Sequence, residues 1–412
     1  MKALVLGAGV VGLTTAWALT EDGWDVVVVD RNPAPGGDAS PGNGAQLSYS
    51  HVAPFASPET LRHMPAMLLQ RNGPVRMRPG FDWDFLRWGL AFLRQCTSGA
   101  VARTTVAQLA LGASSRAEME RLMGTLPLDF GLREAGKLVV HRDAAAFAAA
   151  RRQVARQATL GAEQSVLGPR ACLDLEPGLR ISESALAGGI YTAADQVGDC
   201  AAFCRDLAGV LRTRNTVEWR LSEPCTPEVR AGRLVGVRIG ADLVEADETV
   251  LCLGAGAPAF ARAAGVRLPI VPMKGYSLTV TPRTGLSHSV TDAARKVVFA
   301  PLRDGEVRVA GIADFVGQDR TLDPARVGVV VQATRESLDL DAAEDMRPWT
   351  GLRPVTPDSR PLIGPSGLPG LFLNTGHGGL GWTLAAGSAR LAADMLAGAP
   401  TEVDAGAFAL AR

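Results

Sequence analysis

The sequence lacks an excess of charge of either sign, because 42 lysine and arginine residues balance 42 aspartate and glutamate residues. A chain without net charge has no basic surface of the kind that binds nucleic acid, and no polybasic run marks an anionic membrane. The six cysteines form no Cys-x-x-Cys pair and no zinc-type spacing, and the five histidines are dispersed. We therefore expect reduced thiols, no metal site and no nucleic-acid partner.

The composition also lacks the features of a disordered protein. Charged residues make up only 20% of the chain and hydrophobic residues 47%. This balance, with plentiful glycine and proline, is typical of a compact, loop-rich enzyme, and 412 residues are enough for two or three domains. A glycine motif begins almost at Met1 and leaves no room for a signal peptide, so we expect a cytoplasmic location.

The first thirty residues are typical of a strand, a glycine turn, a helix and a second strand. Gly7 permits a tight turn, Gly9 lets a pyrophosphate approach the backbone, and Gly12 lets the helix pack closely on the sheet. The unpaired N–H groups and the positive dipole end of the helix favour a phosphate at this turn. The pattern predicts a dinucleotide site.

An acidic residue, Asp30, ends the second strand at the spacing of about 20 residues that such sites show. Its carboxylate can accept hydrogen bonds from an adenosine ribose. The motif alone does not distinguish FAD from NAD. Residues 3–20 carry no formal charge, but their three glycines and three threonines argue against a membrane span.

A polar, glycine-rich stretch follows at residues 36–48 and suits neither a regular helix nor a strand. Two interpretations stay open for it: a flexible linker, or a backbone that wraps closely around a cofactor. The second interpretation assigns Ser40, Asn43 and Gln46 to hydrogen bonds with the diphosphate and ring of the cofactor.

Residues 59–124 are expected to be helical, divided by three prolines. The segment 81–94 is unusually aromatic for a chain with only 5% aromatic residues, and its apolar residues form a wide helical face that leaves Arg87 and Arg94 outside it. This helix is either buried against a second domain or lies at a membrane surface.

Strands and helices alternate through the rest of the chain. We expect strands at 136–140, 249–253, 272–281, 297–300 and 307–310, a hairpin at 234–246, and helices at 144–162, 199–212 and 324–340. This alternation predicts a mixed α/β fold, in which a discontinuous Rossmann-like nucleotide domain carries an inserted antiparallel-sheet domain. We assign residues 1–57, 150–180, 195–268 and 349–412 to the first domain and residues 58–149, 181–194 and 269–348 to the second.

The C-terminal section carries two further patterns. Residues 349–358 form a rigid, proline-flanked segment with one arginine, Arg353, among apolar neighbours. Residues 371–383 read as a strand that opens onto a glycine turn and a last helix. The N-terminus of that helix suits the electron-rich pyrimidine end of a flavin.

Four motifs together resemble the FAD-dependent D-amino-acid oxidase superfamily, in particular its D-amino-acid dehydrogenases of the small-subunit type. They are Ser40-x-x-Asn43-x-x-Gln46-x-Ser48, Lys274-Gly275-Tyr276-Ser277-Leu278-Thr279, Trp349-Thr350-Gly351-Leu352-Arg353-Pro354-x-Thr356-Pro357-Asp358, and Asn374-Thr375-Gly376-His377-Gly378-x-Leu380-Gly381-Trp382-Thr383. The cofactor loop at 41–45 and the region 213–230 depart from the pattern of the family.

The resemblance implies FAD held between the two domains and oxidation of a D-amino acid to its imine, which hydrolyses to a 2-oxo acid and ammonia. It also implies electron transfer to a membrane quinone. Our hypothesis for the reaction itself is hydride transfer from the α-carbon to flavin N5. A glycine, sarcosine or D-hydroxyproline oxidoreductase, or an oxidase that uses O₂, is the alternative on the same scaffold. More distant alternatives are a non-catalytic or transferase flavoprotein and a nicotinamide-dependent dehydrogenase.

Three residues are the catalytic candidates. The resemblance implies that Arg353 binds the substrate carboxylate, and a planar, permanently charged guanidinium suits that ligand, although an internal salt bridge is the alternative. Tyr276 is a candidate for a second substrate contact or is a core residue. Lys274 lies either near the flavin or against strand-end carbonyls, and His377 is expected to shape the turn below the flavin rather than to act as a base.

The cofactor-binding candidates come from the two glycine turns, the intervening loop and one further glycine turn. They are Gly7, Gly9, Val10, Val11, Gly12, Asp30, Arg31, Ser40, Asn43, Gln46, Leu47, Gly254, Gly378, Gly379, Leu380, Gly381, Trp382 and Thr383.

Overall fold

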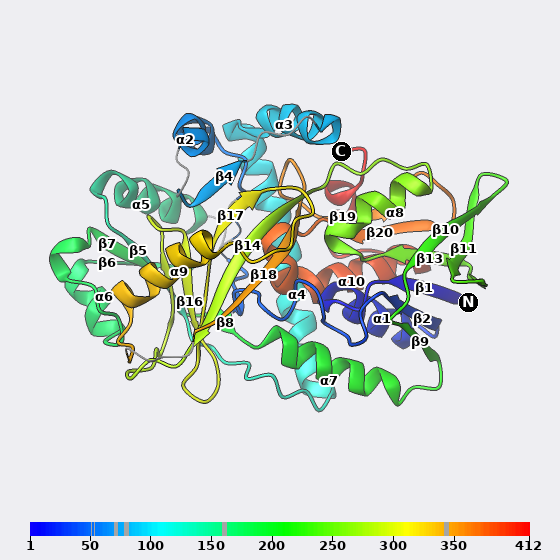
Figure 1. Ribbon diagram of the computed structural model, residues 1–412, viewed down its shortest axis with the longest axis horizontal. Helices are drawn as coiled ribbons and strands as arrows, with labels where there is room; N and C mark the ends of the chain where they lie inside the picture. Colours follow the sequence, from blue (N-terminus) through cyan, green and yellow to red (C-terminus); the bar gives the residue numbers. More distant parts are fainter. Residues whose placement is uncertain (51, 53, 70–72, 78–81, 159–162, 342–345) are drawn as a thin grey trace.

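The protein, described here as a computed structural model, is seen in residues 1–412 except 51, 53, 70–72, 78–81, 159–162 and 342–345. Figure 1 shows two regions side by side, one built around β1 and the other around β14. The predicted mixed α/β architecture is confirmed.

The first region contains a six-stranded sheet with the order β19-β20-β13-β1-β2-β9. β1 pairs in parallel with β2 and β13, whereas β19 runs antiparallel to β20. The strands are β1 (Lys2–Leu6), β2 (Asp25–Asp30), β9 (Val217–Leu221), β13 (Glu248–Leu251), β19 (Leu362–Pro365) and β20 (Leu371–Thr375). This is the Rossmann-like arrangement that the glycine motif predicts.

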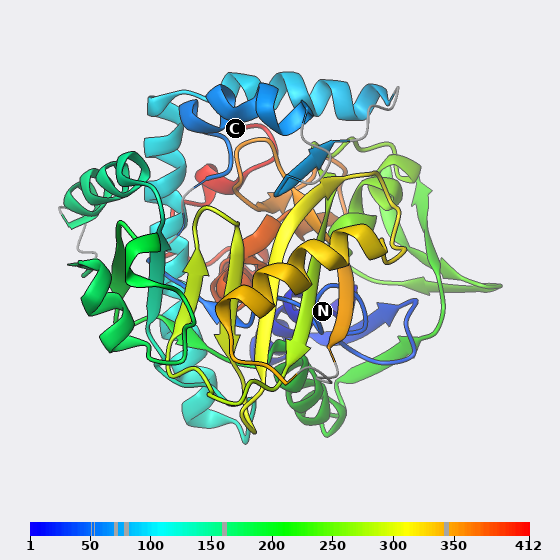
Figure 2. The ribbon, with the colours of Figure 1, turned by 60° about the vertical axis from the view of Figure 1, so that its left-hand side comes forward.

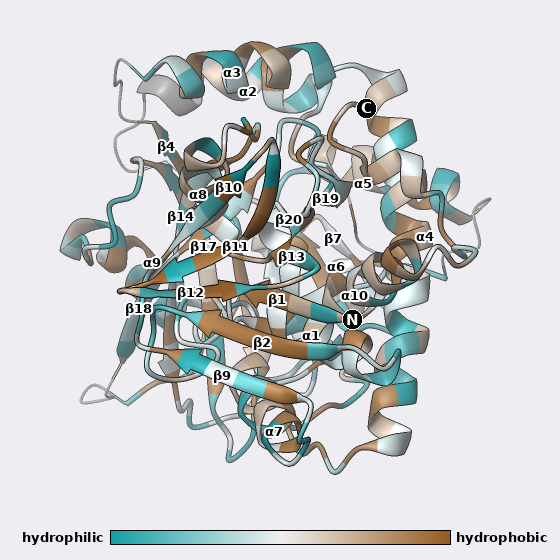
Figure 3. Ribbon diagram, turned by 90° about the vertical axis from the view of Figure 1, so that its right-hand side faces the viewer, coloured by the Kyte–Doolittle hydropathy of each residue, from teal (hydrophilic) through white to brown (hydrophobic). Residues whose placement is uncertain are grey.

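Both faces of this sheet are covered, which explains why β2 is a continuous run of valines rather than an alternating strand. Ala3 and Val5 of β1 lie in a core with α1, α7 and α10, while Leu4 and Leu6 lie in a second core with α8 and β11. Figure 3 shows β1 and β2 as hydrophobic strands within these layers. The helices are α1 (Val10–Glu21), α2 (Pro58–Leu69), α3 (Trp83–Gln95), α4 (Ser98–Thr125), α5 (Ala144–Ala158), α6 (Pro169–Leu175), α7 (Cys200–Arg212), α8 (Ala257–Ala263), α9 (Pro324–Ser337) and α10 (Gly381–Ala397).

The second region contains a nine-stranded sheet with the order β18-β14-β17-β16-β15-β5-β7-β6, and β4 pairs with β17. α9 packs across β14 and β17 on one face of this sheet, as Figure 2 shows. The strands are β4 (Val75–Met77), β5 (Lys137–His141), β6 (Ser165–Leu167), β7 (Gly188–Thr192), β14 (Val271–Val280), β15 (Ser289–Asp292), β16 (Val297–Pro301), β17 (Val307–Phe315) and β18 (Arg347–Val355).

The remaining elements are small. They are the strands β3 (Gln46–Leu47), β8 (Gln196–Val197), β10 (Cys225–Arg230), β11 (Arg233–Ile239) and β12 (Asp242–Glu245), and the 3₁₀ turns η1 (Glu183–Ala185), η2 (Gly254–Gly256), η3 (Gly378–Leu380) and η4 (Ala405–Phe408). The predicted hairpin at 234–246 and the strand at 249–253 are confirmed as β11, β12 and β13.

One local prediction is wrong and another is made more specific by the structure. The helical prediction for residues 59–124 is wrong at β4, because Val75–Met77 pairs with β17. The segment 349–358, predicted as a rigid, proline-flanked segment, lies largely in β18, which pairs with β14 through residues 347–355. The helix predicted over 144–162 corresponds to α5 over residues 144–158, and residues 159–162 lie outside the described part.

Sheet pairing bears on the predicted division into two domains. β6 and β18 lie in ranges assigned to the first domain, yet both strands pair within the nine-stranded sheet. A division by sheet would move them to the second domain, and the domain boundaries stay a prediction. Within the described residues, no helix is both long and apolar enough to span a membrane.

Candidate active site

A cavity of about 2120 Å³ lies between the two sheets. Single-ligand pockets usually measure about 300–1,000 Å³, so this cavity has room for a dinucleotide and a substrate together. It is bordered by the first glycine turn, the loop after β2, the turn before α10 and the cavity-facing side of β14, β17 and β18.

The first glycine turn has the steric restrictions that the motif predicts. Gly7 has φ +106°, and a Cβ there would lie 2.7 Å from the Cys252 carbonyl oxygen. A Cβ on Gly12 would lie 1.7 Å from the Gly7 carbonyl oxygen, so Gly12 keeps α1 against the turn, and it does not border the cavity. Gly9, Val10 and Val11 do border it. Nothing closer than 3.6 Å meets a Cβ on Gly9, which leaves its backbone open to a ligand.

Asp30 and Arg31 also border the cavity, at the end of β2. The Asp30 carboxylate accepts hydrogen bonds from Ala8 N at 2.7 Å and from Asn32 N at 2.8 Å. It therefore fastens the glycine turn to β2, a role that the sequence reasoning did not assign to it. Arg31 pairs with Asp38 at 2.9 Å on the surface.

The loop after β2 is packed rather than free. Arg308 of β17 donates from Nη1 to the carbonyl oxygens of Pro41, at 2.7 Å, and Asn43, at 3.1 Å. A Cβ on Gly42 would lie 2.0 Å from the Trp349 ring, so this indole presses directly on the loop. These contacts hold Asn43 at the edge of the cavity and argue against a flexible linker.

The other loop candidates divide into two groups. Ser40 borders the cavity and its Oγ accepts from Val10 N at 3.2 Å, while Gln46 borders the cavity and its Nε2 donates to Ser289. Leu47 does not border the cavity, because it is fully buried in the core with α1 and α10. Leu47 therefore belongs to the loop motif because it packs in the core and not because it contacts the cavity.

The second glycine turn lies opposite the first. Gly254 and the residues from Gly378 to Trp382 border the cavity, and no side chain in the described part of the chain caps the N-terminus of α10. Its N–H groups are therefore available to an electron-rich ligand. Thr383 lies behind the turn, where its Oγ1 accepts from Ser48 N at 3.4 Å.

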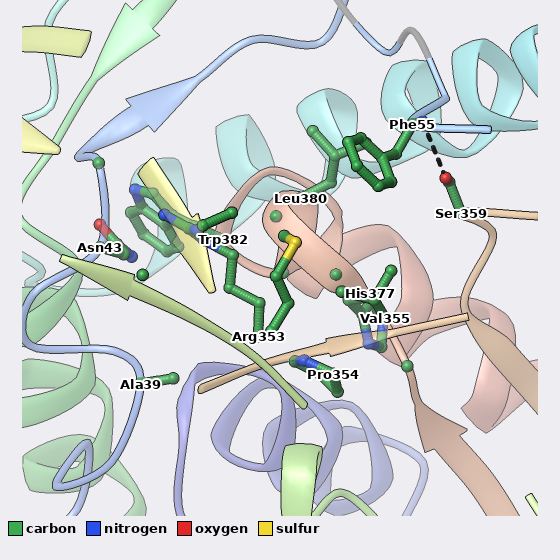
Figure 4. A pocket seen from close by; sticks show the side chains of 18 of the residues that line it. Ala39, Asn43, Phe55, Arg353, Pro354, Val355, Ser359, His377, Leu380 and Trp382 are labelled. Atoms are coloured by element: carbon green, nitrogen blue, oxygen red, sulfur yellow. Dashed lines mark hydrogen bonds between the residues drawn. The ribbon is translucent and has the colours of Figure 1, made fainter. Parts of the chain in front are cut away.

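Arg353 projects from β18 into the cavity, with Leu380, His377 and Trp382 around it in Figure 4. No carboxylate of the described residues lies within ion-pair distance of it, and its protein acceptor is the Ile312 carbonyl oxygen, 3.3 Å from Nη1. Burial lowers the pKa of this guanidinium, and no neighbouring charge counteracts that effect. A desolvated cation without an anionic partner is costly, so the arrangement favours an anionic ligand.

His377 is buried in the turn before η3, and its Nε2 has no hydrogen-bond partner in the described protein. Burial lowers the pKa of His377 to about 3, so the imidazole is neutral at physiological pH. Its backbone forms a bridge with Val355 at the end of β18. His377 therefore links the turn to the strand that carries Arg353.

The structure does not bring Lys274 to the cavity. Arg353 lies opposite Met273 in the β14–β18 register, so Met273 and Gly275 share its face and Lys274 points to the other face. There the Lys274 Nζ lies 3.3 Å from Asp319 Oδ2 and also donates to the Thr321 carbonyl. Lys274 is thus a structural residue and its predicted catalytic role is not supported by this position.

Tyr276 lies on the same side of β14 as Lys274. It borders the cavity, but its side chain is only 2% exposed and belongs to the core that includes Val330 of α9. Its hydroxyl donates to Asp314 Oδ2 at 3.0 Å. Burial and the Asp314 carboxylate raise the pKa of Tyr276, so the hydroxyl stays protonated. This geometry corresponds to the core interpretation of Tyr276 rather than to a substrate contact.

Sequence reasoning missed several residues around Arg353. Gly275, Met273, Ile312 and Trp349 border the cavity, and Arg308 holds the loop. The available signal was the period of two along β14, which places Met273 and Gly275 on one face. No pattern in the sequence shows that this face, rather than the other, meets the cavity.

Comparisons with known proteins agree with this geometry. The family described as "DAO: FAD dependent oxidoreductase" matches residues 2–395. The chain is 43% identical over 426 residues to D-amino acid dehydrogenase 2 of Ralstonia nicotianae, with all of both chains covered. It is 40% identical to D-amino acid dehydrogenase 2 of Pseudomonas aeruginosa, covering 98% of this chain and 96% of the relative.

Solved structures show the same fold at lower identity. Glycine oxidase from Geobacillus kaustophilus superposes with a TM-score of 0.76 at 19% identity, covering 100% of this chain and 98% of that one. Iminodiacetate oxidase from Chelativorans sp. superposes with a TM-score of 0.74 at 21% identity, covering 99% and 98%.

Proposed function

The chain belongs to the DAO family of FAD-dependent oxidoreductases, and we propose that it oxidises D-amino acids to 2-oxo acids and ammonia. The observation that carries this proposal is Arg353, a cavity-facing guanidinium with no carboxylate partner among the described residues. The relatives named D-amino acid dehydrogenase, at 40 to 43% identity over nearly the full chain, support the choice of substrate class.

The described residues fit FAD. The N-termini of α1 and α10 open onto the same cavity, and the first glycine turn leaves its backbone accessible. In this proposal Asp30, at the end of β2, would accept a hydrogen bond from the ribose, and residues 378–382 would lie on the flavin side; all of them border the cavity. When bound, FAD supplies the acceptor for the hydride that leaves the substrate α-carbon.

The residues of the chain orient the substrate. Arg353 would bind the carboxylate through two parallel N–H donors, which leaves the α-carbon and the amine free to point away from β18. The amine must lose its extra proton before the α-carbon gives up a hydride, and water can accept that proton. His377 is neutral and buried, so it serves to shape the site. The resulting imine takes up water and releases ammonia.

An anaerobic titration tests this function. We expect the yellow flavin absorbance to bleach on addition of D-alanine or another D-amino acid and to persist with the L-enantiomers. Glycine, sarcosine and D-hydroxyproline belong in the same panel, since bleaching by these compounds alone would support the alternative on this scaffold. Absence of bleaching by every amine would favour a non-catalytic or transferase role, and a colourless protein would favour a nicotinamide enzyme.

The electron acceptor is proposed to be a membrane quinone rather than O₂. Consumption of O₂ during turnover would contradict this choice, whereas reduction of a soluble quinone analogue with no O₂ consumption would support it. The name dehydrogenase carried by the relatives supports an acceptor other than O₂.

The helix α3 supplies the surface for the proposed membrane contact. One of its faces is buried, because Trp88 and Phe92 pack in a core with Phe315. The other exposes Trp83, Leu86, Leu90 and Leu93, which follow helical spacing. Together with Leu61 of α2, these make five of the ten large exposed hydrophobic side chains of the described residues, so the exposure is concentrated on one layer. Figure 3 shows α2 and α3 together at one edge.

Vesicle sedimentation tests this contact. We expect the protein to bind vesicles that contain anionic lipid and a Trp83→Ser, Leu90→Ser variant to bind at least about tenfold more weakly. Val229→Ser and Leu322→Ser remove exposed apolar side chains of other regions and serve as controls. Equal binding by the α3 variant and the controls would leave α3 without a membrane role.

A further inference from the structure

The guanidinium of Arg353 lies directly over the position that a side chain at residue 275 would occupy. A Cβ placed on Gly275 would lie 2.5 Å from each of the Arg353 atoms Cζ, Nη1 and Nη2. A point at this equal distance from the three atoms lies out of the plane of the guanidinium, above its Nη1–Nη2 side. Any side chain at position 275 would therefore occupy the space that Arg353 fills.

The backbone of Gly275 does not itself require glycine. Its φ lies outside the left-handed region, so alanine is compatible with the local conformation. Arg353 and Gly275 share a face of the β14–β18 pair, since Arg353 is opposite Met273 and Gly275 follows two residues later. The absence of a side chain at this position is thus explained by Arg353.

A β-bulge in β17 provides a second contact to the Arg353 guanidinium. Between the pairs Lys274–Asp314 and Tyr276–Gly311, β17 advances three residues while β14 advances two. The extra length includes Ile312, whose φ is +47°, a left-handed conformation that is unfavourable for a β-branched residue. In this conformation, its carbonyl oxygen accepts from Arg353 Nη1 at 3.3 Å.

We infer that Gly275 and the bulge at Ile312 form a seat that positions Arg353 for the substrate carboxylate. Gly275 leaves the space that the guanidinium occupies, and the Ile312 carbonyl holds one of its N–H groups, so the remaining donors have a defined direction. Gly275 is therefore a positioning residue. The inference rests on the proposed function, because it concerns how Arg353 meets a carboxylate.

The variant Gly275→Ala tests the seat. Because displacement of a positioning group by about 1 Å can cost roughly 100-fold, we expect KM for the best amino acid to rise about 30- to 100-fold, with kcat changed less than about threefold. Calorimetric titration with pyruvate, a non-oxidisable carboxylate, should show affinity reduced by a similar factor. The flavin spectrum and Tm report whether the variant is folded.

The control is Gly189→Ala in β7 of the same sheet. A Cβ there would lie 2.7 Å from Cys172 Sγ, so it creates comparable crowding, but Gly189 does not border the cavity. We expect unchanged KM and unchanged pyruvate affinity in this variant. An equal rise in KM in both variants would show a general packing effect and overturn the seat.

A double-mutant cycle separates positioning from crowding. In an Arg353→Leu background, Gly275→Ala should change pyruvate affinity by less than about twofold, because the group it displaces is already absent. An undiminished effect in that background would overturn the inference, as would unchanged pyruvate affinity in Gly275→Ala alone. A wild-type protein that is not bleached by any amino acid would refute the proposed function, while the pyruvate titrations would still decide about the seat.

Discussion

The charged side chains on the two faces of the sheet formed by β14, β17 and β18 differ in whether they have an oppositely charged partner. On the α9 face, Asp314 is fully buried and lies 2.8 Å from Arg326 and 2.6 Å from Arg76, and it accepts the Tyr276 hydroxyl. On the cavity face, Arg353 has no carboxylate within ion-pair distance among the described residues. Arg326 and Arg76 thus share a carboxylate partner within the protein, whereas Arg353 has none among the described residues.

This difference separates structural charges from functional ones. A buried charge that is paired within the protein stabilises the fold only through its partners, and losing one partner is costly. A charge in the cavity without an internal partner favours a ligand of opposite charge, so removing that side chain should affect ligand binding more than folding. Substitutions on the α9 face should therefore mainly lower stability, whereas substitution of Arg353 on the cavity face should mainly raise KM.

The largest effect is expected on the α9 face. Arg326→Leu removes a fully buried partner of Asp314 and should lower the free energy of unfolding by about 3–5 kcal/mol, measured by urea denaturation. Arg170→Leu breaks an exposed pair with Asp174 and should cost less than about 1 kcal/mol. Similar stability of the two variants would contradict the structural role of the buried pair.

The next effect concerns Arg353. Arg353→Leu should raise KM for the amino acid about 100-fold or more, because two charge-assisted hydrogen bonds to the carboxylate are lost. Its free energy of unfolding should stay within about 1 kcal/mol of the wild type, since no internal ion pair is broken. Arg353→Lys keeps the charge without the planar fork of donors, so its KM should lie between the values for the wild type and for Arg353→Leu. An unchanged KM in Arg353→Leu would remove this residue from the substrate site.

Tyr276→Phe should have a smaller effect and only on stability. Loss of the hydroxyl that donates to Asp314 should cost about 1–2 kcal/mol in urea denaturation. KM should change less than about twofold, because the ring lies on the α9 side of β14. A tenfold rise in KM would instead restore Tyr276 as a substrate contact, the interpretation that its place in the motif suggests.

The smallest expected effect is on the pH dependence of stability, through Asp319 near Lys274. Hydrogen bonds from Thr321 and, secondarily, Lys274 lower the pKa of Asp319 to about 2. A carboxylate with a depressed pKa in the folded state stabilises it above about pH 4, and this contribution disappears as pH falls toward 2. Asp319→Asn should thus cost less than about 1 kcal/mol at pH 7, because the group is partly exposed, and nothing near pH 2. A difference independent of pH would contradict this account.

Much of the cofactor site was accessible from the sequence. The glycine turn at Gly7 and Gly9 and the turn at Gly378 depend on local steric requirements, which a short motif carries. Arg353 was accessible because it matches the arginine of the family motif and is the one arginine among the apolar neighbours of residues 349–358. Leu47 and Thr383 belong to the same motifs but lie behind the cavity, because a motif does not separate packing from contact.

The sequence by itself predicted the two glycine turns and many of the strands and helices, because these follow from local sterics and hydropathy, and the family motif singled out Arg353 as the candidate for binding the carboxylate. Only the tertiary structure decided which face of β14 meets the cavity. From Lys274 to Val280 the strand is buried at every position, so both of its faces are covered and the period of two in the sequence does not show which face borders the cavity. The sequence therefore left the roles of Tyr276 and Lys274 open. The partners that neutralise Asp314 come from positions 76 and 326, and contacts between such distant segments exist only in the folded chain.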